Sequence, residues 1–271
     1  MYRFKKHYWL SCCIILIGVI VIMYIPKEAK SEQSFMEPTV FVHGYKGTYH
    51  SFGNMLHRFE YKYQWGHKAL EYRISGNGAI HVNNRAAKSE GPAFIQVIFD
   101  ENRASFADSV SYLSAALKHM KEKLQIDSIN LVGHSMGGIV ALKFIKEQLS
   151  SSDDYPNVEK YVAIGSPFDG IYQESYFDIH QDAGAQDLMP HSDALEALYT
   201  NEHTFPIDID VLSIASTGDI IAVPKSVSAL ENIIPSTQYE KVLIDNRYLG
   251  HSDLHESEKV DKLLYTFLFV E

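Results

Sequence analysis

Five residues, Gly133-His-Ser-Met-Gly137, constrain the fold of this chain of 271 residues more than any other stretch. They fit the pattern G-x-S-x-G, with an apolar run at Ile129–Val132 directly before them and a helix-like segment from about Gly138 to Leu149 directly after. A strand that turns into a helix so abruptly strains the serine backbone and leaves no room for a Cβ on its neighbours. The pattern predicts Ser135 as a nucleophile beside a helix N-terminus, which favours developing negative charge. The alternative is a glycine-rich packing turn.

Strand-like and helix-like segments alternate along the rest of the chain. Alternation of this kind is typical of a mostly parallel sheet with helices on both faces. We expect strands at Thr39–Val42, Glu71–Ser75, Ala79–Val82, Ala93–Phe99, Ile129–Val132, Tyr161–Ile164, Val211–Ala215 and Lys241–Ile244. We expect helices at Tyr49–Phe59, Ser105–Leu124, Gly138–Leu149, Ser226–Ile234 and Ser252–Phe269.

The first 37 residues differ from the remainder. Three basic residues precede an uncharged run, Tyr8–Ile25, that is about long enough to cross a bilayer as a helix. A cleaved signal peptide would have a shorter apolar run followed by small residues, whereas Pro26, Lys27 and Glu28 follow here. We therefore favour an uncleaved signal anchor over residues 1–26, then a polar tether over 27–37 and one domain over 38–271. The positive-inside rule places that domain outside a cell membrane; cleavage would make it secreted.

Cysteine and charge content exclude some classes of protein. Cys12 and Cys13 are the only cysteines, so residues 38–271 cannot form an internal disulfide. The net charge is −10, and residues 1–26 contribute only basic groups, so the remainder is more acidic still. Such a domain lacks the basic surface of a nucleic-acid binder. The composition leaves the oligomeric state open.

Two backbone donors are needed if Ser135 attacks a carbonyl, because the oxygen becomes negative in the tetrahedral intermediate. Met136 N–H, directly after the nucleophile, is one candidate. His43-Gly-Tyr-Lys-Gly47 follows the first expected strand, and its Tyr45 N–H is the second, with Lys46 N–H as the next choice. His43 itself is interpreted as structural.

The base and its orienting acid are expected after the nucleophile in the order acid, then histidine. Asp219 comes after the strand Val211–Ala215, and His251 comes after the last expected strand. Asp245 and His255 are the alternatives; Asp169 and Asp210 are weaker ones. His251 and His255 have the i, i+4 spacing of a metal-binding helix, but the adjacent glutamate and a third ligand are missing, so no metal and no cofactor is expected.

Four motifs together resemble one family. They are HGYKGT from His43, GHSMGG from Gly133, GSPFDG from Gly165 and GHSDLHE from Gly250. The chain is similar to membrane-anchored or secreted α/β-hydrolases of Gram-positive bacteria, known as cell-surface hydrolases of unknown function, from about Thr39 to Phe269. At Thr217–Pro224 it departs from the Ser-Asp-Gly-x-Val-Pro expected there.

The resemblance implies an α/β-hydrolase fold with Ser135, Asp219 and His251 as a catalytic triad. It also implies serine-esterase activity on carboxylic esters, carboxylesterase-like or lipase-like, with a small-molecule or lipid-like ester as substrate. The same intermediate serves acyltransferases, thioesterases and amidases, which stay open as alternatives. A non-catalytic surface binding protein is a further alternative, because fold does not imply function.

A cap insertion is expected after the sixth strand, over about residues 167–207. Between Lys160 and Lys225 the chain has no lysine or arginine. The interval contains eleven acidic residues: Asp169, Glu174, Asp178, Asp182, Asp187, Asp193, Glu196, Glu202, Asp208, Asp210 and Asp219. We hypothesise an apolar-lined and electronegative entrance that disfavours anionic substrates and tolerates neutral or cationic esters; the alternative is that these carboxylates solvate an outer face. The expected substrates are short or neutral acyl esters.

Overall fold

The computed structural model describes residues 37–85, 91–147, 152–200 and 204–270. The predicted anchor over residues 1–26, and the tether except for Glu37, lie outside the described residues. In the described part, none of the helices combines the length and the apolar character that a membrane span requires.

An eight-stranded sheet forms the centre of the described domain, in the order β3-β2-β4-β1-β5-β6-β7-β8. Only β3 pairs antiparallel, in a hairpin with β2, and every other neighbouring pair is parallel. The strands are β1 Thr39–Val42, β2 His67–Ile74, β3 Ile80–Asn84, β4 Ala93–Phe99, β5 Ser128–His134, β6 Asn157–Ile164, β7 Asp210–Ser216 and β8 Tyr239–Ile244.

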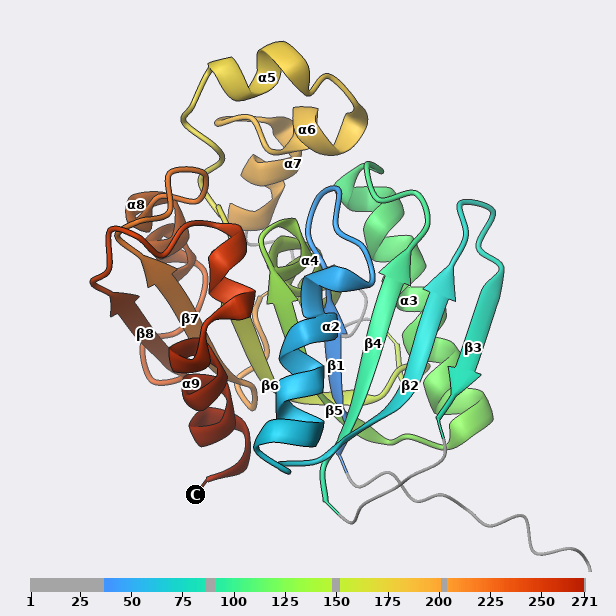
Figure 1. Cartoon of the computed structure of the whole chain (residues 1–271). Helices are drawn as coiled ribbons and strands as arrows, with labels where there is room; N and C mark the ends of the chain where they lie inside the picture. The colour runs from blue at the N-terminus through green and yellow to red at the C-terminus, as the bar shows by residue number, and fades with distance from the viewer. Residues whose placement is uncertain (1–36, 86–90, 148–151, 201–203, 271) are drawn as a thin grey trace, which may run out of the picture. The chain divides into compact units, whose positions relative to one another are not determined.

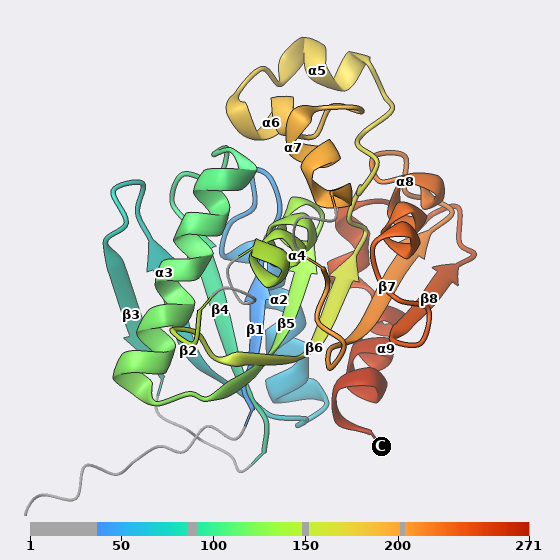
Figure 2. The same cartoon turned by 180° about the vertical axis from the view of Figure 1, so that it is seen from behind.

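Helices cover both faces of this sheet, as Figures 1 and 2 show from opposite sides. The α-helices are α2 His50–His57, α3 Phe106–Leu124, α4 Met136–Glu147, α5 Ser175–Ile179, α6 Ala183–Asp187, α7 Asp193–Glu196, α8 Pro224–Ser228 and α9 Glu258–Phe269. Shorter turns are the π-helical η1 Arg58–Lys62 and the 3₁₀ turns η3 Ala197–Tyr199, η4 Ala229–Asn232 and η5 Ser252–Glu256. Helices α2 and α9 cover one face, and α3, α4 and α8 cover the other. This arrangement confirms the predicted α/β-hydrolase fold.

Strand β1 shows how the sequence builds two cores. Its four residues are all fully buried. Because successive side chains point to opposite faces, Val40 and Val42 enter the cluster under α3 and α4, while Phe41 enters the cluster under α2 and α9. Strands buried on both faces must be apolar throughout, which explains why the short apolar runs of the sequence are central strands.

The predicted helix over Ser105–Leu124 agrees with α3, whose N-cap residue is Ser105. Ser105 caps α3, its Oγ accepting from the Asp108 N–H at 3.1 Å. The prediction of one helix over Ser252–Phe269 is wrong, because Ser257 ends η5 and caps a separate helix, α9. The expected helix over Tyr49–Phe59 ends at His57 and continues as the π-helical η1. The one over Ser226–Ile234 is a short α8 followed by η4.

The segment between β6 and β7 carries α5, α6, α7 and η3. Figure 1 shows these helices above the carboxyl ends of the strands, over the loops that follow β1 and β5. We call this segment, residues 165–209, the cap. Four hydrogen bonds fasten α6 and its N-cap residue to the body. Tyr45 O–H donates to Asp182 Oδ2 at 2.6 Å and Phe106 N–H to Asp187 Oδ2 at 2.6 Å, while Arg103 donates to Asp182 Oδ2 at 3.2 Å and accepts from Gly184 N–H at 3.0 Å.

Candidate active site

Ser135 occupies the turn between β5 and α4. Its φ is +55°, in the left-handed region that non-glycine residues seldom adopt. Its N–H donates to Ile164 O at 2.9 Å and its carbonyl accepts from Gly138 N–H at 3.0 Å, so hydrogen bonds on both sides hold the strained conformation. The side chain is therefore presented at the carboxyl edge of the sheet, beneath the cap.

Close backbone contacts explain the glycines of the pentapeptide. A Cβ on Gly137 would lie 2.3 Å from Val42 O and 2.5 Å from His43 O, which are main-chain atoms of β1 and the loop after it. A Cβ on Gly133 would lie 2.4 Å from Gly138 N. The tight turn therefore rests directly on the end of β1.

Gly137→Ala is expected to lower both stability and activity, because the added methyl must push α4 away from the end of β1. Overpacking of this kind costs about 1–3 kcal/mol, and misplacing a reacting group by about 1 Å costs roughly 100-fold in rate. Gly78→Ala is the matched control, since a Cβ there meets no atom within 4 Å, although φ is +80°. Urea unfolding and ester hydrolysis of the two variants test this. Because the φ of +80° at Gly78 by itself costs an alanine stability, activity is the deciding comparison, and an equal loss of ester hydrolysis in the two variants would contradict the prediction.

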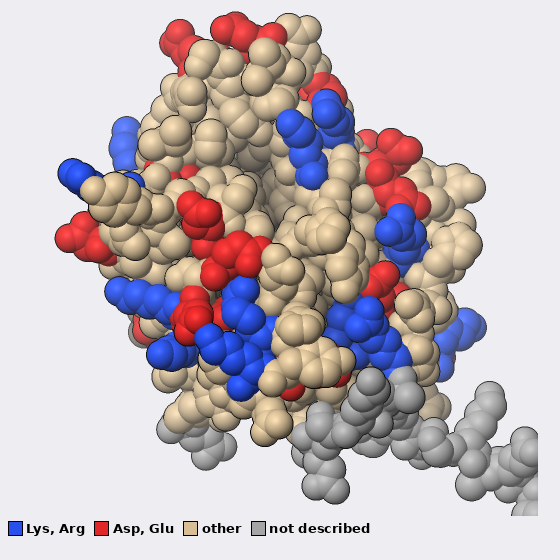
Figure 3. All heavy atoms as spheres, in the orientation of Figure 1, with Lys and Arg blue, Asp and Glu red and all other residues tan. Residues whose placement is uncertain are grey.

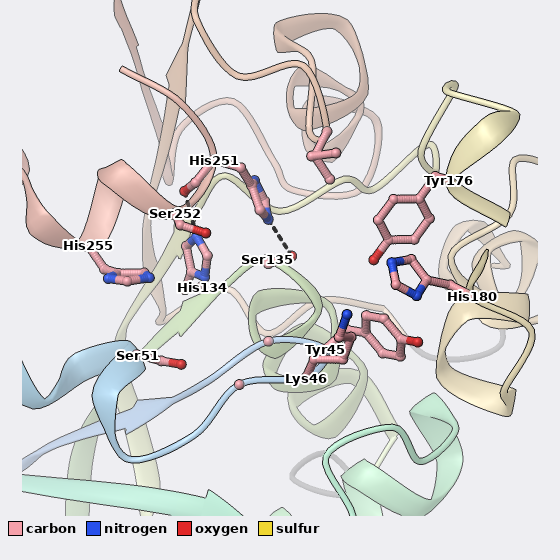
Figure 4. Close-up of a pocket in the computed structure, with 13 residues that line it drawn as sticks. Tyr45, Lys46, Ser51, His134, Ser135, Tyr176, His180, His251, Ser252 and His255 are labelled. Carbon is pink, nitrogen blue, oxygen red and sulfur yellow. Dashed lines mark hydrogen bonds between the residues drawn. The ribbon is translucent and has the colours of Figure 1, made fainter. Parts of the chain in front are cut away.

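A chain of hydrogen bonds joins Ser135, His251 and Asp219. His251 Nε2 lies 2.8 Å from Ser135 Oγ, and His251 Nδ1 lies 2.7 Å from Asp219 Oδ2. Because a carboxylate only accepts, the Nδ1 atom carries the proton and Nε2 is left to accept from the serine hydroxyl. This is the tautomer that a general base requires. The dashed line in Figure 4 marks the contact between His251 and Ser135.

Asp219 is held in place by backbone donors. It lies in the loop after β7 and is 2% exposed. Its other oxygen, Oδ1, accepts from the Ile221 N–H at 2.9 Å and the Ala222 N–H at 2.8 Å. The carboxylate thus has one oxygen fixed by backbone and the other directed at the imidazole. The departure from the expected motif at Thr217–Pro224 leaves the aspartate in contact with His251.

Two backbone N–H groups beside Ser135 have no partner among the described residues. They belong to Met136, the first residue of α4, and to Tyr45, in the loop after β1. Gly44 brings that loop against the nucleophile, since a Cβ on it would lie 2.7 Å from Ser135 Cβ and 3.3 Å from Met136 N. Lys46, the other candidate donor, is occupied, because its N–H donates to Asn102 O at 2.7 Å.

His134 is a residue whose contribution the sequence interpretation missed. Its Nε2–H donates to the His251 backbone carbonyl at 3.1 Å, and its ring lies 4.8 Å from that of His251 between centroids. Burial, and then the neighbouring His251 and His255, hold the pKa of His134 well below its usual value. The residue occupies a variable position of G-x-S-x-G, so the motif itself offers no signal for it.

The alternative histidine and acids lie elsewhere. His255 is half-buried against the far side of His134, with 4.9 Å between ring centroids, and does not contact Ser135. Asp245 is exposed and accepts from Thr217 O–H at 3.2 Å, and Asp169 accepts from Tyr172 O–H. Asp210 begins β7 at the opposite end of the sheet.

His43 is placed as a structural residue. Its Nε2 accepts from Phe99 N–H at 3.0 Å and its Nδ1–H donates to Gly44 O at 2.8 Å. Burial lowers the pKa of His43 to about 4, only partly offset by the bond to Gly44. A neutral imidazole therefore ties β4 to the loop that carries Tyr45.

A cavity of about 340 Å³ opens over Ser135. Its lining is polar and aromatic: Gly44, Tyr45, Lys46, Gly47, Ser51, His134, Ser135, Tyr176, His180, Ile221, His251, Ser252 and His255. Figure 3 shows the hollow beneath the cap, with basic side chains at its right and acidic ones below its left side as well as over the top of the cap. No carboxylate occurs in this lining, so the described cavity wall gives no support to the expected electronegative entrance, which stays a prediction.

Two carboxylates of the cap are engaged by residues of the body. Asp182 accepts from Tyr45 O–H and from Arg103 at 3.2 Å, and its pKa is lowered by these partners despite an opposing effect of burial. Asp187 accepts the first backbone N–H of α3, from Phe106. These acids therefore serve to attach the cap.

The sheet order, the turn at Ser135 and the hydrogen-bonded side chains define an α/β-hydrolase. The chain belongs to a family of alpha/beta hydrolases of unknown function (DUF915), whose model matches residues 26–271. This membership confirms the resemblance found in the sequence. No curated protein matches the chain.

Solved structures with the same fold come from several bacteria. The product of gene lin2722 from Listeria innocua is 23% identical, with a TM-score of 0.72 over 86% of this chain and 94% of that one. A protein named as a cell surface hydrolase, from Lactobacillus plantarum, is 18% identical, with a TM-score of 0.67 over 88% and 93%. A lipase from Bacillus licheniformis is 15% identical, with a TM-score of 0.56 over 88% and 94%. At these identities the likeness concerns the fold alone.

Proposed function

We propose that the chain is a serine hydrolase of carboxylic esters. The observation that carries this proposal is the hydrogen-bonded chain from Ser135 Oγ through His251 to Asp219 at the base of a cavity. His251 takes the proton of Ser135 as the hydroxyl attacks the ester carbonyl. The N–H groups of Met136 and Tyr45 stabilise the negative oxygen. His251 then protonates the leaving alcohol, and water hydrolyses the acyl-enzyme with His251 again as base.

The cavity favours short acyl groups over long lipid chains. Its volume of about 340 Å³ is near the lower end of the range for ligand pockets, and Ile221 is the one aliphatic side chain in the described lining. A long acyl chain would leave much of its apolar surface against polar groups. We therefore place a carboxylesterase ahead of a lipase.

A fluorophosphonate probe tests the proposal, because it reacts with serines that a base activates. We expect the full-length protein to be labelled at Ser135, identified by peptide mapping, and labelling to be lost in Ser135→Ala. Absence of labelling in a folded protein would contradict the proposal and favour a binding role.

We further propose that the domain acts outside the cell membrane, anchored through Tyr8–Ile25. The apolar run and its basic flank support this, and a protein named as a cell surface hydrolase shares the fold. Protease treatment of intact cells tests the location. Degradation of the domain without lysis is the expected result, and full protection would contradict it.

A further inference from the structure

Three polar side chains converge on the cavity wall opposite His251. Lys46 comes from the loop after β1, Tyr176 from α5 and His180 from the residue after α5. Figure 4 shows Tyr176 and His180 across the cavity from His251, with Ser135 between, and Lys46 extending upward from the loop below. The proposed mechanism uses none of the three.

These groups are free to bind a ligand. No described residue forms an ion pair or hydrogen bond with the Lys46 ammonium or the Tyr176 hydroxyl, and His180 Nδ1 is buried without a partner among the described residues. Burial raises the pKa of Tyr176 to about 12, so its hydroxyl stays a donor near neutral pH. Burial, and then Lys46, lower the pKa of His180. At neutral pH the wall thus offers a cation, a hydroxyl donor and a neutral imidazole.

The backbone conformation of Lys46 independently indicates that its side chain has a function. Its φ is +58°, a conformation that glycine or asparagine adopts at less cost than lysine. The conformation is held from outside, because Asn102 O accepts the Lys46 N–H at 2.7 Å and the Asn102 amide donates to Gly47 O at 2.9 Å. A strained residue that also points into a cavity is a candidate for a functional side chain.

The position of His251 decides which part of an ester this wall faces. His251 must protonate the leaving alcohol, so the alcohol lies on its side of Ser135. The oxyanion lies at the Met136 and Tyr45 N–H groups, so we assign the acyl group to the wall beyond them, opposite His251. The cap carboxylate of Asp182, whose charge raises the pKa of both Tyr176 and His180, already accepts from Tyr45 and Arg103, and no described carboxylate forms an ion pair with Lys46.

We propose that Lys46, Tyr176 and His180 bind a carboxylate on the acyl group, so that the substrates are half-esters of short dicarboxylic acids. This inference rests on the proposed function. The bond between acyl carbon and alcohol oxygen breaks, the alcohol leaves with a proton delivered by His251, and water adds to the acyl-enzyme. One half-ester anion and one water yield one alcohol, one dicarboxylate dianion and one proton.

Two pairs of esters test the charge and its position. Monoethyl succinate and ethyl succinamate differ only in a carboxylate against an amide on the acyl side. O-acetylglycolate and O-acetylglycolamide differ in the same way on the alcohol side. We expect kcat/KM of the full-length enzyme to favour monoethyl succinate over its amide by about tenfold at low salt, less at high salt, as for a charged hydrogen bond that water partly screens. The acetyl pair should show no such ratio.

Variants connect the preference to Lys46. In Lys46→Gln the succinate-to-succinamate ratio is expected to fall to about one, whereas Lys46→Arg should retain most of it. Lys123→Gln is the matched control, because it removes the same charge from an exposed position on α3. This control should keep the full ratio, which separates a local contact from the general field of the protein.

The outcomes separate this inference from the proposed function. A wild-type ratio near one at low salt, a ratio unchanged in Lys46→Gln, or a charge preference confined to the alcohol side would overturn the carboxylate subsite while Ser135 still reacts with the probe. Loss of probe labelling and of all ester hydrolysis would instead overturn the proposed function, and the subsite with it.

Discussion

His251→Ala is expected to lower kcat for ester hydrolysis by about 10⁴-fold or more, since the base and the leaving-group acid are removed together. His251 Nε2 lies 2.8 Å from Ser135 Oγ, and no other described base forms a hydrogen bond with this hydroxyl. Labelling by the fluorophosphonate probe should be lost with the activity. Initial rates with a short acyl ester, measured beside Ser135→Ala, give the comparison.

His255→Gln is the control for this substitution. His255 lies one helical turn away in the sequence and contacts His134 rather than the nucleophile. Its replacement should change kcat by less than tenfold, with some loss of stability because the ring is half-buried. If the two histidine variants lose activity equally, His251 is not the base.

Local sequence patterns predicted the part of the site that depends on local geometry. Ser135, Gly133 and Gly137 form a steric unit, since a turn this tight excludes Cβ atoms wherever it occurs. Asp219 and His251 were predictable because parallel strands bring their carboxyl ends to one edge, so residues far apart in the chain meet there. The apolar central strands were found for a related reason, as burial on both faces leaves an uninterrupted hydrophobic run.

Features that depend on contacts between distant parts of the chain could not be predicted from local sequence patterns. The amino half of β6 contains the charged residues Glu159 and Lys160, so only Tyr161–Ile164 read as a strand. Lys160 remains in the strand because its ammonium donates to the carbonyls of Phe267 at 2.8 Å and Leu268 at 3.2 Å. Helix α9 thus accepts hydrogen bonds from a lysine that composition alone would place in a loop.

The cap shows that sequence composition is also a limited guide to the charge of the active site. Counting acidic residues favours an electronegative entrance, but it does not reveal that two of these acids, Asp182 and Asp187, accept hydrogen bonds that attach the cap to the body. Lys46 belongs to a motif whose pattern predicts a backbone donor but says nothing of where the lysine side chain points. Whether a charge faces the cavity or a partner depends on side-chain direction, which composition does not contain.

Asp219→Asn is expected to reduce kcat by about 10⁴-fold in a protein that still folds. An asparagine fits the same space, and its carbonyl oxygen can accept from the Ile221 and Ala222 N–H groups that now bind Oδ1. Its amide N–H₂ then faces His251 Nδ1, which must become an acceptor. The ring proton moves to Nε2, and the imidazole can no longer take the proton of Ser135.

Asp245→Asn provides the comparison, because Asp245 also follows a strand of the sheet edge but is exposed and bonded only to Thr217. It should retain full activity. Thermal unfolding of both variants excludes misfolding as the cause of a loss. If Asp219→Asn retained more than about a tenth of wild-type kcat, His251 would be oriented by its surroundings rather than by the carboxylate. The bond from His134 to the His251 carbonyl would then be the first contact to remove.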